Sequence, residues 1–77
     1  GSMARTQVVE VLAEMVASVV EVSCAVGEDV TPQSTVLLLE SMKMEIPVLA
    51  EVAGTISKVS VSVGDVIQAG DLIAVIS

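Results

Sequence analysis

The two halves of this sequence are imperfect copies of each other. The segment VLAE at residues 11–14 returns at residues 48–51, which is 37 positions further along the chain. Two shorter matches keep this offset: Val-Ser at 22–23 and 59–60, and Val-Gly at 26–27 and 63–64. Two small units of this kind are expected to pack on each other. Each feature of one half therefore predicts a feature of the other.

Aliphatic and β-branched residues dominate the composition. Seventeen Val, six Leu and five Ile occur among the 77 residues, whereas Phe, Tyr and Trp are absent. Such side chains favour strands over helices, so we expect an all-β fold. The chain is long enough for one domain. Its aliphatic residues contribute roughly 1.5–3 kcal/mol each when fully buried, which supports a core without disulfides or a metal.

Eight short strands are predicted, four in each half. Glycines followed by acidic residues mark turns between the apolar runs. We align Glu28-Asp29-Val30 with Asp65-Val66, so that one residue is deleted and the offset falls to 36. We expect two four-stranded antiparallel sheets related by a pseudo-twofold axis, in a flattened β-barrel or sandwich. The predicted strands are residues 8–14, 18–24, a short one near 30, 36–41, 45–50, 55–61, 66–67 and 72–76.

Alternation of valine and serine over residues 59–63 defines one core face. It places Val59, Val61 and Val63 in the core, and the repeat offset adds the equivalent residues Val22, Cys24 and Val26. Cys24 thus takes the place of a core valine. We interpret it as a buried small hydrophobic residue rather than a reactive thiol, because no basic neighbour is visible.

Charge and composition exclude several classes of function. Three basic and ten acidic residues give a formal charge of −7, which repels nucleic acids and anionic lipid. The absence of histidine removes the usual proton shuttle and the commonest metal ligand, so we predict no metal site and no catalytic residues. No apolar run is long enough for a membrane helix, which takes about 18 residues. With its single cysteine, the chain is expected in the cytoplasm.

Lys43 lies where the two halves join. If the halves are equivalent, residues 41–44 form the hairpin that connects them, with Met42 and Lys43 at its centre. Tight hairpins normally use Asn-Gly or Asp-Gly there, because the central residues need φ > 0. A tip that breaks this rule is a candidate functional site. In the alternative interpretation, Met42 and Met44 fill the core and Lys43 is only a solvated charge.

The segment Glu40-Ser41-Met42-Lys43-Met44-Glu45 resembles the attachment motif of biotin carboxyl carrier domains, in the biotinyl/lipoyl-attachment family. The resemblance extends to the glycine turns at 27–30 and 64–66 and to Gly-Thr-Ile at 54–56, and it is greatest to the short, single-domain biotinylated proteins of mycobacteria. It implies the barrel-sandwich hybrid fold, here without the extra "thumb" hairpin of some bacterial carriers. Two departures are Ala-Ser at 17–18, commonly Gly-Thr, and Ala-Glu at 50–51, commonly Ala-Pro.

The resemblance implies that a biotin protein ligase attaches biotin covalently to Lys43. Met42 and Met44 would serve recognition by the ligase or a partner, and Glu40 and Glu45 could contact the ligase. The domain would then carry carboxyl groups between a biotin carboxylase and a carboxyltransferase, in an acyl-CoA carboxylase system. It would not be an enzyme itself, and we expect a monomer in isolation. A lipoyl carrier and a plain interaction module are the competing hypotheses.

The resemblance also sets the predicted domain boundaries. Gly1-Ser2 ahead of Met3 has the form of a vector-derived remnant. We therefore predict a remnant and flexible N-terminus at residues 1–7, followed by one biotinyl-attachment domain at residues 8–77. Lys58 lies outside the motif and is expected to be an ordinary surface charge.

Overall fold

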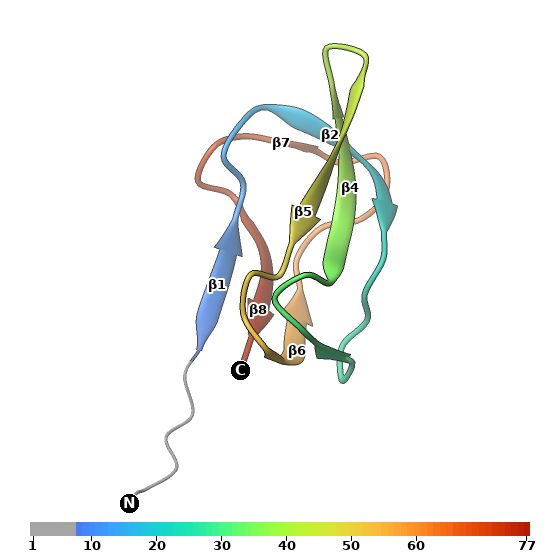
Figure 1. The fold of residues 1–77 in the computed structure, drawn as a ribbon. Coiled ribbons are helices and arrows are strands. Elements are labelled where there is room, and N and C mark those ends of the chain that lie inside the picture. The colour runs from blue at the N-terminus through green and yellow to red at the C-terminus, as the bar shows by residue number, and fades with distance from the viewer. Residues whose placement is uncertain (1–7) are drawn as a thin grey trace, which may run out of the picture.

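A computed structural model describes residues 8–77 of the chain; the remnant and flexible N-terminus predicted at residues 1–7 lie outside the described residues. The described chain consists of eight β-strands joined by turns, which confirms the all-β prediction (Figure 1). Residues 8–77 contain no helix with the length and apolarity that a membrane crossing requires. The strands are β1 (Val9–Leu12), β2 (Ala17–Val22), β3 (Asp29–Val30), β4 (Thr35–Ser41), β5 (Met44–Leu49), β6 (Gly54–Val59), β7 (Val66–Ile67) and β8 (Leu72–Ile76).

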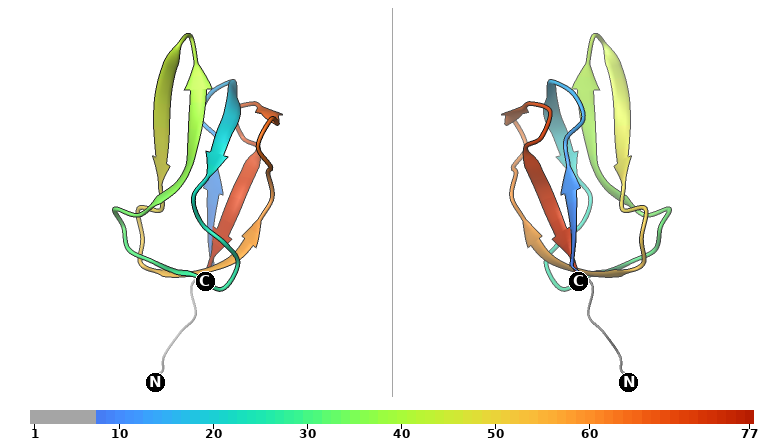
Figure 2. Two further views of the ribbon diagram at one scale, coloured as in Figure 1. Left: turned by 90° about the vertical axis from the view of Figure 1, so that its right-hand side faces the viewer. Right: turned by 90° about the vertical axis from the view of Figure 1, so that its left-hand side faces the viewer.

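The strands form two four-stranded antiparallel sheets with the orders β1-β8-β6-β3 and β5-β4-β2-β7. Exchanging each strand with its counterpart in the other half, β1 with β5 and so on, converts one order into the other. The predicted pseudo-twofold relation is therefore confirmed. Each sheet contains two strands from each half, and the short third strands pair across the halves, β3 with β6 and β7 with β2. The β4–β5 hairpin extends from the end of the molecule opposite the C-terminus (Figures 1 and 2).

The repeat offset is 37 throughout, so the predicted drop to 36 is wrong. The amide of Ala25 donates to the Glu28 carboxylate at 3.0 Å, and the amide of Ser62 donates to the Asp65 carboxylate at 2.8 Å. Glu28 and Asp65 therefore occupy equivalent turn positions, and no residue is deleted between them. The prediction matched Asp29 with Asp65 because both are aspartates. In the structure, Glu28 and Asp65 make the same turn hydrogen bond although their side chains differ in length.

The core lies between the two sheets and is built from aliphatic side chains. Val22, Val59 and Val61 are half-buried and pack against it, as predicted. Val26 and Val63 are exposed instead, at 65% and 64%, because the strands end before them and the chain turns at the glycines that follow. The buried residues are Val11, Ala13, Ala17, Val19, Cys24, Val30, Val36, Leu37, Leu39, Ala50, Ile56, Ile67, Ile73, Ala74 and Ile76.

Cys24 is buried, which confirms its interpretation as a core residue. Burial raises the pKa of its thiol, and the nearby Glu28 carboxylate raises the pKa further. The reactive thiolate is therefore scarce near neutral pH. We expect iodoacetamide to alkylate Cys24 at least about tenfold more slowly in the folded protein than in the chain unfolded by guanidinium. Equal rates, followed by mass spectrometry at one mildly alkaline pH, would contradict this.

Gly54 is required by a close approach of two chain segments at the start of β6. A Cβ atom at this position would lie 2.6 Å from the Cγ2 atom of Ile76 and 2.9 Å from the carbonyl oxygen of Ser77. Ile76 is fully buried and has no space to move. The Gly-Thr-Ile segment noted in the sequence thus allows the start of β6 to pack closely against the end of β8.

Candidate functional site

The hairpin loop between β4 and β5 has a backbone geometry that its two residues disfavour. Ser41 pairs with Met44, so only Met42 and Lys43 form the loop. Their φ angles are 53° and 65°, as a two-residue turn with φ > 0 at both positions requires. Left-handed backbone costs roughly 1–2 kcal/mol for a residue that is not glycine. The prediction that this turn breaks the local rule is confirmed.

All three residues at the hairpin end project into solvent. Met42 is 88% exposed and Met44 is 59% exposed, and Lys43 is exposed between them. The alternative in which both methionines fill the core is therefore wrong. Two large apolar side chains are thus held in water at the end of the hairpin. We call Met42, Lys43 and Met44 the tip.

Glu40 and Glu45 lie next to the tip on facing strands. They are cross-strand partners in the β4–β5 pair, directly below the pair of Ser41 and Met44, and both are exposed. Like charges opposite each other in an antiparallel pair are destabilising. The structure thus brings together the two carboxylates that the sequence placed on either side of the lysine motif.

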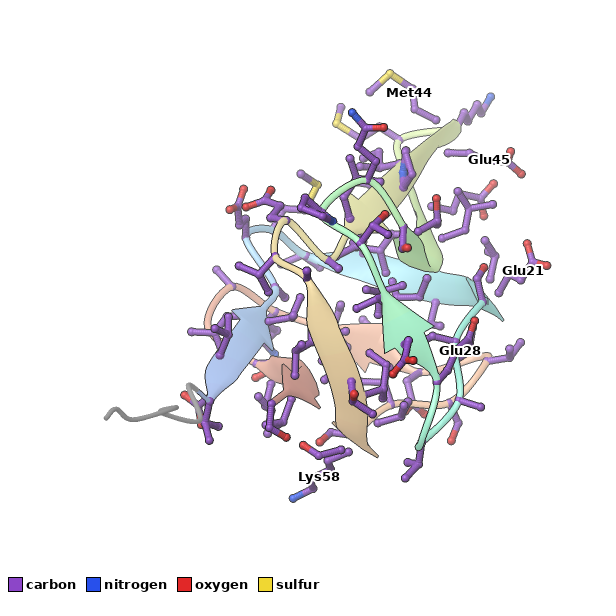
Figure 3. The ribbon with its side chains drawn as sticks, turned by 60° about the horizontal axis from the view of Figure 1, so that its bottom comes forward. Glu21, Glu28, Met44, Glu45 and Lys58 are labelled. Atoms are coloured by element: carbon purple, nitrogen blue, oxygen red, sulfur yellow. The ribbon has the colours of Figure 1, made fainter. Side chains whose placement is uncertain are left out.

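Lys58 provides a natural comparison for Lys43. It lies within β6, opposite Val75 of β8, and is exposed on the sheet that does not contain the hairpin. Figure 3 shows Lys58 on the side of the molecule away from Met44 and Glu45. The two lysines of the described chain therefore differ in backbone geometry and in neighbours.

The sequence did not predict an open groove between the two edge strands β1 and β5. Its volume is about 680 Å³, and it is lined chiefly by residues 9–15 and 46–52. These segments are repeat equivalents of each other, and none of the tip residues lines the groove. Residues 8–77 also contain no cluster of three or more His, Cys, Asp or Glu side chains suited to a metal ion.

The tip is suited to carrying a covalently attached group. The lysine amine lies at the end of a protruding hairpin, where an enzyme can approach it and an attached group can move freely. The tip residues do not line the groove between β1 and β5. The site can therefore present a cofactor to other proteins.

The comparisons with known proteins agree with this geometry. The chain matches the Biotin_lipoyl family model, described as "Biotin-requiring enzyme", over residues 7–76. It is 69% identical over 68 residues to the biotinylated protein TB7.3 homolog of Mycobacterium leprae, covering 88% of this chain and 96% of that protein. The Kluyveromyces lactis urea carboxylase structure matches with a TM-score of 0.86 and 30% identity, covering 99% of this chain and 7% of that one. A single-chain, multi-domain long-chain acyl-CoA carboxylase matches with a TM-score of 0.83 and 28% identity, over 97% of this chain and 7% of that one.

The chain belongs to the biotinyl/lipoyl-attachment family, as its sequence motif predicted. It is a biotin carrier domain of the kind found in biotin-dependent carboxylases, and biotin is its cofactor. The predicted choice of biotin over lipoate is therefore confirmed.

Proposed function

We propose that Lys43 is the biotin attachment residue and that the domain carries carboxyl groups between a biotin carboxylase and a carboxyltransferase. The observation that carries this proposal is the tip: an exposed lysine, between two exposed methionines, in a turn whose backbone disfavours all but glycine-like residues. The match to a long-chain acyl-CoA carboxylase supports an acyl-CoA as the final acceptor.

The Lys43 amine is the only group of this chain that forms a bond in the proposed reaction. Its Nζ atom attacks the carboxyl carbon of biotin that a biotin protein ligase has activated as the adenylate. An amide forms, AMP leaves, and the amine gives up a proton. The bound biotin supplies a ureido nitrogen that accepts and releases a carboxyl group. The protein's own contribution is to hold this group at high local concentration near each enzyme.

The neighbours of Lys43 have distinct proposed roles. Met42 and Met44 offer flexible thioether side chains that adapt to the surfaces of several enzymes in turn. Glu40 and Glu45 present two carboxylates beside the tip, which suit basic residues of the ligase. Neither pair takes part in bond formation.

We also propose that the domain is non-catalytic, works in the cytoplasm and is a monomer in isolation. The absence of histidine supports the first point, and the unpaired Cys24 thiol supports the second. The edge strands support the third, because β5 carries Pro47 and β1 carries Glu10, and both residue types hinder edge-to-edge pairing.

Supplying each cofactor with its own ligase tests the proposal. The full chain is co-expressed with a biotin protein ligase and biotin in one culture, and with a lipoate ligase and lipoate in another. We expect the intact mass to increase by one biotinyl group in the first culture and to stay unchanged in the second. Lipoylation, or no modification in either culture, would contradict the proposed function.

A further inference from the structure

The two sheets of this protein can be compared with each other position by position. Their strands are related by the same offset, and they share the same order and pairing. Where the halves carry the same residue, the fold explains it: residues 11–14 and 48–51 are identical and line the same groove. Where outward residues differ between equivalent positions, the backbone does not require the difference. Such positions can reflect a binding surface present on one sheet only.

The outward face of the β5-β4-β2-β7 sheet begins directly below the tip. Glu40 lies between Glu45 on β5 and Ser18 on β2, and Ser18 lies opposite Val66 on β7. This row runs across all four strands. It is next to the pair of Ser41 and Met44 along the hairpin, whose side chains point to the opposite face, so the outward face ends beside the tip.

A second row lies further from the tip. Leu38 pairs with Pro47 on one side and with Glu21 on the other, and Val20 precedes Glu21 at a bulge in β2. Val20 is 36% exposed, and Val66 in the first row is 67% exposed. In Figure 3, Met44, Glu45 and Glu21 lie one after another along one side of the molecule. We define the tip-side face as four apolar residues and three glutamates: Val20, Leu38, Pro47, Val66, Glu21, Glu40 and Glu45.

The other sheet is polar at most of the equivalent positions. The counterparts of Val20, Pro47 and Val66 are Ser57, Glu10 and Asp29, and the counterpart of Glu21 is Lys58. The counterpart of Glu40 is Ser77, and the counterparts of Leu38 and Glu45, which are Val75 and Val8, are apolar. The same backbone thus accepts polar residues at three positions where the tip-side face exposes apolar ones.

The charge of the tip-side face is of one sign. Glu40 and Glu45 lie on the tip side of Leu38 and Pro47, and Glu21 lies opposite Leu38. Within residues 8–77 the lysines lie elsewhere, Lys43 at the tip and Lys58 on the other sheet. A partner that covers this face is expected to provide an apolar contact with Lys or Arg side chains beside it. An acidic surface of this kind also excludes acidic partners.

We propose that the tip-side face is the docking surface for the biotin carboxylase subunit, which binds it with a basic surface beside an apolar contact. This inference rests on the proposed function. The position of the face beside the tip brings a docked enzyme next to Lys43. A covalent link to the enzymes supplies effective concentration in long carboxylase chains such as urea carboxylase, of which this chain matches 7%. A carrier of the length of the Mycobacterium leprae relative, of which this chain matches 96%, has to bind its enzyme through its own surface.

The test uses the full biotinylated chain and recombinant biotin carboxylase subunits of Mycobacterium leprae, assayed in turn with ATP and bicarbonate. Glu21→Lys and Val66→Asp change the tip-side face at sites away from Lys43. Glu10→Lys in β1 and Val8→Asp directly before β1 make the same changes beside the other sheet, and the 65% exposure of Val8 is close to the 67% of Val66. We expect the KM for the carrier to rise about tenfold or more for the first two variants only. Salt should raise the KM of the unchanged carrier as well.

Two outcomes would overturn the inference while leaving the proposed function intact. Glu21→Lys and Val66→Asp could show the same KM as their controls on every subunit, which means that no docking occurs on this face. They could instead slow biotinylation by the ligase, which assigns the face to the ligase. An unchanged chain that fails to accept biotin at Lys43 would overturn the proposed function itself, and the inference with it.

Discussion

Replacing Lys43 by arginine is expected to reduce biotin attachment and carboxyl transfer to background. Arginine keeps the positive charge and most of the length of the side chain, but its guanidinium stays protonated and does not form the amide. The substitution leaves the turn geometry available, because the side chain points into solvent. We therefore expect thermal unfolding of Lys43→Arg to match that of the unchanged protein. Carboxyl transfer is measured in the complete carboxylase assembly.

The matched control is Lys58→Arg, which makes the same chemical change on the other sheet. It should retain full biotinylation and full carboxyl transfer. If the tip were only a contact for docking, Lys43→Arg would retain most of the activity, since charge and size are preserved. Activity of the Lys43→Arg assembly near that of the unchanged one would therefore contradict the carrier mechanism.

Replacing Glu51 by proline is expected to lower the free energy of unfolding by about 3 kcal/mol. Glu51 has a φ angle of 66°, which the proline ring cannot adopt, and its amide donates a hydrogen bond to the Pro32 carbonyl at 2.9 Å. The lost hydrogen bond accounts for about 1 kcal/mol and the displaced backbone for about 2 kcal/mol. Such a loss is a large part of the roughly 4–11 kcal/mol expected for a domain of this size. Urea unfolding followed by circular dichroism measures it.

Glycine substitutions at two equivalent positions provide the control. Glu51→Gly relieves the left-handed backbone and should stabilise the protein by up to about 1 kcal/mol. Glu14 is the repeat counterpart of Glu51, but its φ angle is not positive. Glu14→Gly should therefore destabilise by about 0.4–1 kcal/mol, because glycine adds only freedom to the unfolded chain. The same sign for both substitutions would contradict this account.

Most of the fold could be predicted because the same strand pattern occurs twice in the sequence. The strands, the two sheets and the pseudo-twofold relation follow from matched apolar runs and glycine turns. The predicted deletion of one residue is wrong because it matches Asp29 with Asp65 on residue type alone. The true counterpart of Asp65 is Glu28, and only the hydrogen bonds of the two turns reveal this. The burial of Val26 and Val63 was an error because alternation shows a face of a strand but not where the strand ends.

Part of the site could likewise be predicted from the sequence, and part could not. The exposed tip could be predicted because Met42 and Lys43 are poor turn residues at a position where the repeat demands a tight turn. The left-handed backbone of Glu51 could not, because Glu14 is the same residue at the equivalent position and has another conformation. The tip-side face also stayed hidden, since its residues become neighbours only through the cross-strand register.

Locating the biotinyl group within the chain shows whether biotin is attached to Lys43. The chain is co-expressed with a biotin protein ligase, digested, and mapped by tandem mass spectrometry. We expect one biotinyl group on the peptide that contains Met42, Lys43 and Met44, and an unmodified Lys58. A biotinyl group on Lys58, or a chain without any, would contradict it.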